Sequence, residues 1–512
     1  MAFLRSSFVA FAFFAFGFMQ AADLWAPLID MGGTLFPSYL VATAPLDRER
    51  VWGRPGRNYL GDVNGQLGIE IVPPRDGAEF VLTVSSQRFI LPTKVAGKLK
   101  RGGMKYRIYP TIEYDLERLN QLLEPTTERV SFTVEIDGQP AETKQLTANV
   151  RSIYDCPFFI KTAAETGGVE IRWMFAAYVN ENHPWIDQLL KDALDRKLVA
   201  GFVGYQQGPA VAEEQVFAVW NILQNRGIKY SNAVTPSLVS DRVFSQHIRP
   251  FEDAISGAQA NCVDGSVLMA SIFRKIGMDV SLVVVPGHCY LVVVLDPTNG
   301  KRMAIETTLL GSADLKAQSL TRELDSLLSG RKNNLSHTTF EHAVAVGAQN
   351  FNENLPRFGK EPAYSLVNIE AARGLGVIPL PSRTASLSQQ GQEWQRRSDR
   401  DPAVVRLEDD NDFNEQGRDT LGGVGVTDLT IQLRLRLGLP LAASGAVIGS
   451  IEPQSAAAKA GLLAGDLIVA INGRLVRNAR EAVAASTKPE TLRTKVQYLR
   501  GNSEYKTEVD ER

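Results

Sequence analysis

The chain has 512 residues, of which 44% are hydrophobic and 22% are charged. This length excludes a single small module and predicts about two to four domains of ordinary size. The 55 Lys and Arg residues nearly balance the 57 Asp and Glu residues, so the charge gives no reason to expect a dedicated nucleic-acid-binding protein. Three cysteines are too few for a disulfide-rich scaffold, and their odd number leaves at least one thiol unpaired within the monomer.

Residues 1–22 are predicted to be a signal peptide or an N-terminal membrane anchor. Arg5 is followed by an uncharged, strongly apolar run from Ser6 to Ala22, which is typical of a secretory signal. The run is only slightly shorter than the roughly 20 residues that a membrane-spanning helix needs. We therefore expect a periplasmic or secreted protein, with membrane contact only if the leader stays uncleaved.

Residues 46–150 are predicted to form an antiparallel β-sandwich. Short segments rich in β-branched and aromatic residues recur there, separated by turn residues such as Pro73, Pro74 and Gly77. These segments contain no residues at catalytic spacing. A positioning or binding role is therefore expected for this domain.

A mixed, mainly helical region is predicted for residues 184–380. Its best-marked helix covers residues 213–225 and ends at Gly227. Residues 381–420 are rich in Ser, Gln, Arg, Asp and Asn and have few large apolar residues, so they predict an exposed linker. A compact apolar pattern returns in residues 421–512.

Cys262 is predicted to open a helix. Asn261 is a good N-cap, the following apolar residues recur at helical spacing, and Gly277 stops the pattern. The positive end of the helix dipole favours a thiolate, which is the nucleophilic form of cysteine. Asp264 is expected to face this N-terminal turn as a dipole partner.

Three strands are expected after this helix. Residues 280–285 and 289–295 form the first two, and His288 lies at the entry to the second. A further turn leads into a third strand, residues 303–307, which carries Glu306. A histidine and a carboxylate are thus expected on adjacent strands behind a helix-borne cysteine.

This order resembles the transglutaminase-like superfamily, whose core is related to papain-like cysteine proteases. The run ANCVDGSVLMASIFRKIGM resembles its nucleophile motif, and VPGHCYLVV and AIETT resemble its histidine and acid motifs. The resemblance is good over residues 246–308 and looser over residues 213–379. It implies a transglutaminase-like/papain-like α+β core within residues 184–380.

The resemblance also implies the roles of individual residues. Cys262 would attack a carbonyl carbon, His288 would take its proton and pass it to the leaving amine, and Glu306 would orient the imidazole. The backbone N–H of Cys262 is one candidate oxyanion donor, and the side-chain amide of Gln246 is a second. The resulting thioester can react with water or with an amine, so both a peptidase or amidase and an amine-incorporating transglutaminase remain open.

Two departures from the family pattern keep a non-catalytic alternative open. Cys289 and Tyr290 follow the histidine where many members have a small residue and Trp, and an ETT run stands where many have DPT. The alternative is a transglutaminase-like envelope scaffold or binding protein. In an oxidising compartment Cys262 could also pair with Cys289 or Cys156 in a structural disulfide.

No metal ion and no cofactor are expected. The five histidines include no pair with the i, i+4 spacing of the HExxH motif. The sequence also has no Gly-rich phosphate-binding loop of the P-loop type, which argues against nucleotide use.

Residues 421–512 resemble a PDZ domain, particularly the kind attached to bacterial envelope proteases. EPQSAAAKAGL predicts a short helix, and AGDLIVAINGRLV predicts a strand pair with a tight Asn472-Gly473 turn. Such a domain binds an extended peptide as an added strand and holds the terminal carboxylate in a backbone nest. An intramolecular packing role is the alternative. The resemblance places the peptide-binding loop at Leu421, Gly422, Gly423, Val424, Gly425 and Val426.

The sequence thus predicts a multidomain α+β protein with a β-sandwich, a transglutaminase-like core and a PDZ domain. The preferred function is an exported cysteine-dependent acyl-transfer enzyme, most simply a peptidase or amidase. Its expected partners are a polypeptide substrate and a C-terminal peptide ligand in the PDZ groove, not a nucleic acid.

Overall fold

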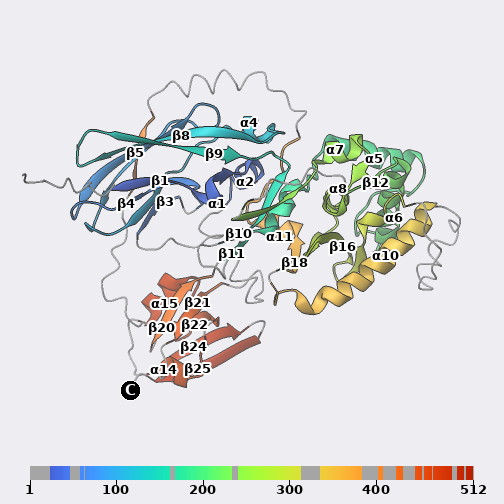
Figure 1. Ribbon diagram of the computed structural model, residues 1–512. Coiled ribbons are helices and arrows are strands. Elements are labelled where there is room, and N and C mark those ends of the chain that lie inside the picture. The colour runs from blue at the N-terminus through green and yellow to red at the C-terminus, as the bar shows by residue number, and fades with distance from the viewer. Residues whose placement is uncertain are drawn as a thin grey trace, which may run out of the picture.

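The computed structural model describes residues 24–46, 58–62, 64–161, 168–232, 240, 242–312, 335–361, 363–382, 402–407, 423–429, 444–451, 455–463, 465–486, 493–500 and 503–510. The predicted signal peptide or anchor, residues 1–22, lies outside this part of the chain. No helix among the described residues is both long and apolar enough to cross a membrane. Several separate sheets combine with helices along the chain, so the multidomain α+β prediction is confirmed (Figure 1).

Two sheets dominate the N-terminal region. One has four strands in the order β1-β4-β7-β3, and the other has six in the order β19-β6-β5-β8-β9-β2. Every second residue of β5 is buried, as in Phe80, Leu82 and Val84, because one face of the strand packs on the core. The elements are β1 (Trp25–Ile29), α1 (Asp30–Gly33), β2 (Thr34–Leu35), α2 (Pro37–Ala42), β3 (Tyr59–Gly61), β4 (Leu67–Ile71), β5 (Ala78–Ser86), β6 (Thr93–Leu99), β7 (Tyr106–Tyr109), α4 (Leu116–Asn120), β8 (Thr126–Ile136), β9 (Glu142–Val150) and β19 (Val404–Leu407).

The N-terminal sheets differ from the prediction in two respects. The long strands pair antiparallel as expected, but β3 with β7, β2 with β9 and β19 with β6 pair in parallel. The sheets also recruit β1 and β2 from before residue 46, and β19 from the predicted linker 381–420. β2 has only two residues and pairs only with the distant β9, so an alternating pattern could not reveal it.

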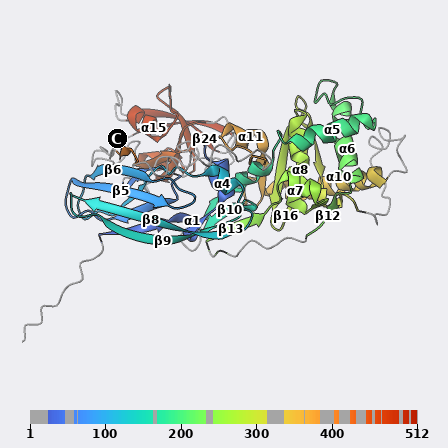
Figure 2. The same cartoon turned by 90° about the horizontal axis from the view of Figure 1, so that it is seen from above.

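The middle region is built around an antiparallel sheet with the order β17-β16-β15-β18. Val283, Tyr290 and Val292 on one face cluster with Phe351 of α10. The other face, which includes Leu291, belongs to the main core and lies against α8 (Figure 2). The elements are β10 (Asp155–Lys161), β11 (Gly168–Glu170), η1 (Arg172–Tyr178), α5 (Pro184–Asp195), α6 (Pro209–Asn225), β12 (Lys229–Tyr230), β13 (Val243–His247), α7 (Phe251–Ser256), β14 (Gln259–Ala260), α8 (Cys262–Lys275), β15 (Val280–Val285), β16 (His288–Asp296), β17 (Lys301–Ile305), η2 (Thr307–Leu309), α10 (Leu335–Asn354), η4 (Leu355–Arg357), β18 (Ser365–Asn368) and α11 (Ile369–Gly374).

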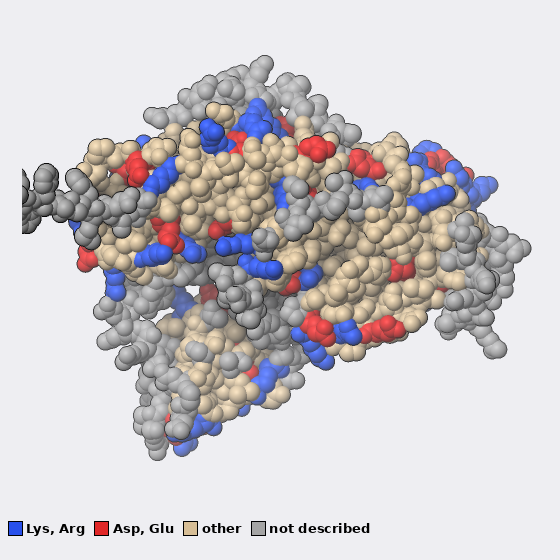
Figure 3. Space-filling model, in the orientation of Figure 1, with Lys and Arg blue, Asp and Glu red and all other residues tan. Residues whose placement is uncertain are grey.

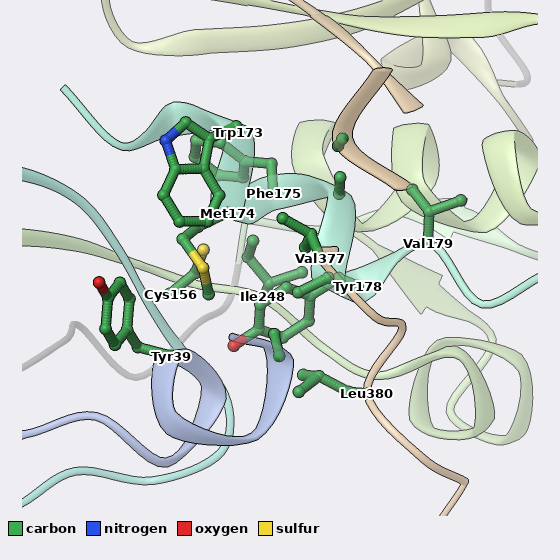
Figure 4. Close-up of a cluster of buried hydrophobic side chains, with 14 of the residues drawn as sticks. Tyr39, Cys156, Trp173, Met174, Phe175, Tyr178, Val179, Ile248, Val377 and Leu380 are labelled. Carbon is green, nitrogen blue, oxygen red and sulfur yellow. The ribbon is translucent and has the colours of Figure 1, made fainter. Parts of the chain in front are cut away.

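One continuous hydrophobic core joins the N-terminal sheets to the middle region. Tyr39 of α2 and Cys156 of β10 lie close to Met174 and Tyr178 of η1 (Figure 4). The segment that follows α11 returns to the same cluster. There the backbone N–H of Leu380 donates to the carbonyl oxygen of Ala177 at 2.8 Å. The stretch between the predicted β-sandwich, which ends at residue 150, and the predicted core domain, which begins at residue 184, is therefore part of this shared core.

The C-terminal region has its own small core and a sheet with the order β20-β21-β22-β24-β25. Asn472 and Gly473 both have positive φ, 51° and 77°, and form the predicted tight turn between β22 and β23. Arg500 holds the buried carboxylate of Asp466 through Nε (2.7 Å) and Nη2 (2.8 Å). The elements are β20 (Val424–Asp428), β21 (Ala446–Ile451), α14 (Ala456–Lys459), β22 (Leu467–Ile471), β23 (Arg474–Leu475), α15 (Ala479–Ser486), β24 (Arg493–Arg500) and β25 (Ser503–Asp510).

Charged side chains of both signs are interspersed over the face of the molecule in Figure 3. This distribution agrees with the formal net charge of −2.

Candidate functional site

Cys262 is the first residue of α8, as the sequence predicts. Asn261 caps the helix, since its side-chain oxygen accepts from the backbone N–H groups of Val263 (2.9 Å) and Asp264 (2.8 Å). The helix ends at Lys275, just before Gly277, whose φ is +78°. The Cys262 side chain is half-buried and its thiol is free.

Asp264 completes a capping box and is fully buried. Its Oδ2 accepts from the Asn261 backbone N–H (3.0 Å) and from Nη1 of Arg249 (2.7 Å), and its Oδ1 accepts from the Arg249 backbone N–H (2.8 Å). The expectation that Asp264 faces the N-terminal turn of α8 is confirmed. Arg249, which the sequence analysis did not single out, ties the segment after β13 to the start of the helix.

His288 and Glu306 form a short hydrogen bond. Nε2 of His288 lies 2.6 Å from Oε2 of Glu306, and the His288 side chain is 30% exposed whereas Glu306 is buried. β16 begins at His288, and β17 ends at Ile305, so Glu306 follows the strand directly and is the N-cap of η2. The sequence pattern predicts Glu306 within the strand, but the strand ends one residue earlier, at Ile305.

Glu306 has further hydrogen-bond donors that the sequence analysis missed. Its Oε1 accepts from the Thr308 hydroxyl (2.7 Å) and the Thr308 backbone N–H (3.1 Å), and its Oε2 accepts from Nδ2 of Asn350 in α10 (3.4 Å). Burial raises the pKa of Glu306, but the hydrogen bonds and the charge of His288 outweigh burial and lower the pKa below its usual value. Glu306 is therefore ionised at neutral pH.

His288 interacts with Cys262 as well as with Glu306. The pKa of His288 is raised to about 10. The largest cause is the interaction with the Cys262 side chain, and the second largest is the hydrogen bond with Glu306. The two partners stabilise the imidazolium, so the ring is charged at neutral pH. The structure thus brings Cys262, His288 and Glu306 together.

Contacts between α8 and η2 fix the distance between the cysteine and the carboxylate. The Thr307 hydroxyl donates to the Cys262 carbonyl oxygen (3.2 Å) and lies 3.1 Å from the hydroxyl of Ser266. A Cβ added at Gly265 would lie only 3.2 Å from Cβ of Thr307. Gly265 therefore permits the close approach of η2, which begins directly after Glu306.

The other two cysteines are buried and free. Burial raises the pKa of Cys156 and of Cys289 above the ordinary thiol value. The alternative of a disulfide between Cys262 and Cys289 or Cys156 is not what the structure contains, because all three thiols are free.

Two tyrosines lie beside the three residues. The ring of Tyr290 stacks near that of His288, with centroids 5.9 Å apart, and Nδ2 of Asn354 lies 3.4 Å from its hydroxyl. Tyr230 of β12 is 44% exposed, and its pKa is raised by burial and by the charges of Cys262 and Glu306. No local sequence signal indicates Tyr230, because its position depends on parallel pairing of β12 with β14.

Gln246 lies in β13, opposite Cys156 of β10. Its side-chain amide donates to the carbonyl oxygen of His247 at 3.0 Å. The oxyanion role of Gln246 stays a prediction.

Within the described ranges, no group of three or more His, Cys, Asp and Glu side chains is arranged to hold a metal ion.

The expected peptide-binding loop lies partly outside the described residues, which exclude Leu421 and Gly422. Gly423 has a φ of +94° and leads into β20, so Val424, Gly425 and Val426 form a strand where a loop was expected. Val424 is buried and paired with Ile451 of β21, which explains its extended conformation. The role of these residues in peptide binding stays a prediction.

α15 lies beside β20 at one edge of the C-terminal sheet. Among the described strands β20 is the outermost, and the Ala479 backbone N–H at the start of α15 donates to Oδ1 of Asp428 (2.7 Å). α15 is thereby held beside the edge strand.

Comparison with known proteins identifies this C-terminal region. Residues 447–497 match the PDZ domain family. The crystal structure of the HtrA3 PDZ domain bound to a phage-derived ligand (FGRWV) is 24% identical, with a TM-score of 0.15, and the match covers 17% of this chain and 80% of that chain. The HtrA-type protease AlgW with decapeptide is 27% identical, with a TM-score of 0.16, over 17% of this chain and 27% of that chain. No curated protein matches the chain significantly. The chain therefore carries a PDZ domain at its C-terminal end.

Proposed function

We propose that the middle region is a transglutaminase-like acyl-transfer enzyme with Cys262 as its nucleophile. The position of His288 carries this proposal, because its Nε2 lies 2.6 Å from Oε2 of Glu306 and the neighbouring Cys262 side chain is the largest cause of its raised pKa. A nucleophile paired with a base that a third group orients is the arrangement that covalent acyl transfer requires. The family resemblance of the three motifs supports the same assignment.

In the proposed reaction the Cys262 sulfur attacks the carbonyl carbon of a bound amide, and the carbonyl π electrons move to oxygen. Glu306 occupies Nε2 of His288, which leaves Nδ1 to exchange the proton with the thiol. The imidazolium then passes this proton to the leaving amine as the C–N bond breaks, and a thioester remains. At the first position of α8 the Cys262 N–H has no intrahelical acceptor, so it can donate to the oxyanion.

The thioester is resolved by water or by an amine. We favour water, hence a peptidase or amidase acting on polypeptides outside the cytoplasm, as the N-terminal sequence suggests. Attack by an amine would instead give a cross-link through the same intermediate.

The test uses casein as the probe, with release of labelled peptides reporting hydrolysis and monodansylcadaverine incorporation reporting amine transfer. Cys262→Ala should abolish whichever activity the wild type shows. Cys156→Ala is the matched control, because Cys156 is a buried thiol on β10 outside the site. Activity that survives Cys262→Ala would contradict the proposal.

The PDZ domain is proposed to bind an extended polypeptide at the edge of β20. No described strand pairs with the outer edge of β20, and this edge and the neighbouring α15 support addition of a further strand between them. Peptides selected from a random library with free C-termini should bind the full chain, and their C-terminally amidated copies should bind much more weakly. Equal binding of both forms would contradict carboxylate recognition.

The PDZ domain also supports a second candidate function, a non-catalytic envelope scaffold. In that case peptides would bind the chain, but Cys262→Ala would change neither hydrolysis nor amine incorporation.

A further inference from the structure

A strand lies within the segment that was predicted to be a linker to the PDZ domain. β19 pairs in parallel with β6, with Val405 opposite Val95 and Leu407 opposite Gly97. It extends the six-stranded N-terminal sheet at the β6 edge. Sheet edges carry unpaired backbone groups that can pair with another strand. The chain covers this edge with its own linker.

Two glycines leave room for β19 to lie close to the strands of both N-terminal sheets. A Cβ added at Gly97 would lie 2.8 Å from the carbonyl oxygen of Leu407, so the close approach requires glycine at this position. A Cβ added at Gly61 of β3 would lie 3.5 Å from Cδ1 of Leu407. The Leu407 side chain therefore reaches a strand of the second sheet, and Leu407 is partly buried against the main core.

The rest of β19 is held weakly. The side chains of Val404 and Val405 are 50% and 54% exposed, and Arg406 is exposed too. A short strand with few buried apolar contacts can open locally while the remaining fold stays intact. Leu407 is thus the side chain through which β19 packs on the main core.

We propose that β19 is a docking strand that fastens the linker to the N-terminal sheet and so sets the tether length of the PDZ domain. With β19 docked, residues 408–422 alone connect the sheet to the PDZ domain, and fully extended they reach roughly 50 Å. With β19 released, the connection comprises residues 383–422 and reaches roughly 140 Å.

Docking changes where a PDZ-bound polypeptide can be found. A connection of fewer residues keeps the PDZ domain nearer the β6 edge, so docking raises the concentration of its bound polypeptide there. Release lets the PDZ domain reach farther from this edge and lowers that concentration. The inference concerns the tether and does not rest on the catalytic role of Cys262.

The first test measures amide hydrogen exchange of residues 404–407 in the full chain. Leu407→Ala removes the packing of β19 on the main core, and Val405→Ala is the matched control because Val405 lies on the same strand but is exposed. Exchange should become about tenfold faster in Leu407→Ala and stay within about twofold of the wild type in Val405→Ala. Unprotected amides in the wild type, or equal effects of both variants, would overturn docking.

The second test measures the maximum dimension of the same proteins by small-angle X-ray scattering. The dimension should increase in Leu407→Ala, and also in Gly97→Ala, which obstructs the strand from the β6 side. An unchanged dimension in a variant whose β19 amides have lost protection would overturn the tether claim. Neither measurement involves a substrate, so their failure is distinguishable from failure of the proposed acyl transfer.

Discussion

Nε2 of His288 lies 2.6 Å from Oε2 of Glu306, and the carboxylate is buried while the imidazole remains partly exposed. This geometry orients the ring, since a buried partner with three further donors has little freedom to move. The negative charge of Glu306 also stabilises the imidazolium.

Glu306→Gln should lower the rate of acyl transfer on the order of 100-fold or more, because it removes the charge that supports the imidazolium and keeps the shape of the side chain. The measurement is turnover of labelled casein by the variant and the wild type. Glu353→Gln on α10 is a control, since that side chain lies outside the three-residue arrangement. Equal losses in the two variants would point to a general structural effect.

His288 should remain protonated through neutral pH. Its pKa in the folded state, about 10, exceeds the ordinary value of 6.5. The stabilisation from its protonated form is therefore complete below about pH 6.5 and is lost as the pH rises towards 10. In Cys262→Ala the largest cause of the shift is gone, so the pKa measured by NMR of the ring should fall. A ring that titrates near 6.5 in the wild type would contradict the pairing.

Thr308 should act as a positioning residue for Glu306. Thr308→Val removes the hydroxyl that donates at 2.7 Å and keeps the size of the side chain. A lost hydrogen bond to a charged group corresponds to about 1.5 kcal/mol, so we expect roughly a tenfold lower rate and a lower pKa of His288. Thr308→Ser should restore both. A variant with unchanged His288 titration would show that the hydroxyl does not act through Glu306.

Arg500→Met should destabilise the PDZ domain. It leaves the carboxylate of Asp466, which is 1% exposed, without its charged partner. We expect a loss of about 2 kcal/mol, less than for a fully buried pair because Arg500 is partly exposed. Hydrogen exchange of β22 and β24 in the full chain measures the loss. Arg493→Met, which affects an exposed pair with Asp510, should change little.

The sequence best predicts those helix ends and turns that are determined by neighbouring residues. Asn261 and Gly277 bounded α8, and Asn472-Gly473 marked the β22–β23 turn, because caps and tight turns are determined by neighbouring residues. α6 begins four residues before the predicted start at 213, because Pro209 takes its first position.

The remaining features depend on contacts between distant residues. β19 has four residues and gains its partner only from β6, so no local alternation could reveal it. Asn350 reaches Glu306 from α10, which is separated from it by a long stretch of sequence. Thr308 is the exception. It stands two residues after Glu306, and a backbone N–H at this spacing can donate to the side-chain oxygen, so this contact is local in the sequence.

The most direct test of the central claim is the rate of alkylation of Cys262 by iodoacetamide at neutral pH in the wild type and in His288→Ala, followed by mass spectrometry of the modified peptide. If His288 activates Cys262, the half-buried Cys262 should be modified while buried Cys156 and Cys289 stay unmodified, and modification of Cys262 should be at least tenfold slower in His288→Ala. Equal rates of Cys262 modification in the wild type and in His288→Ala would contradict the account.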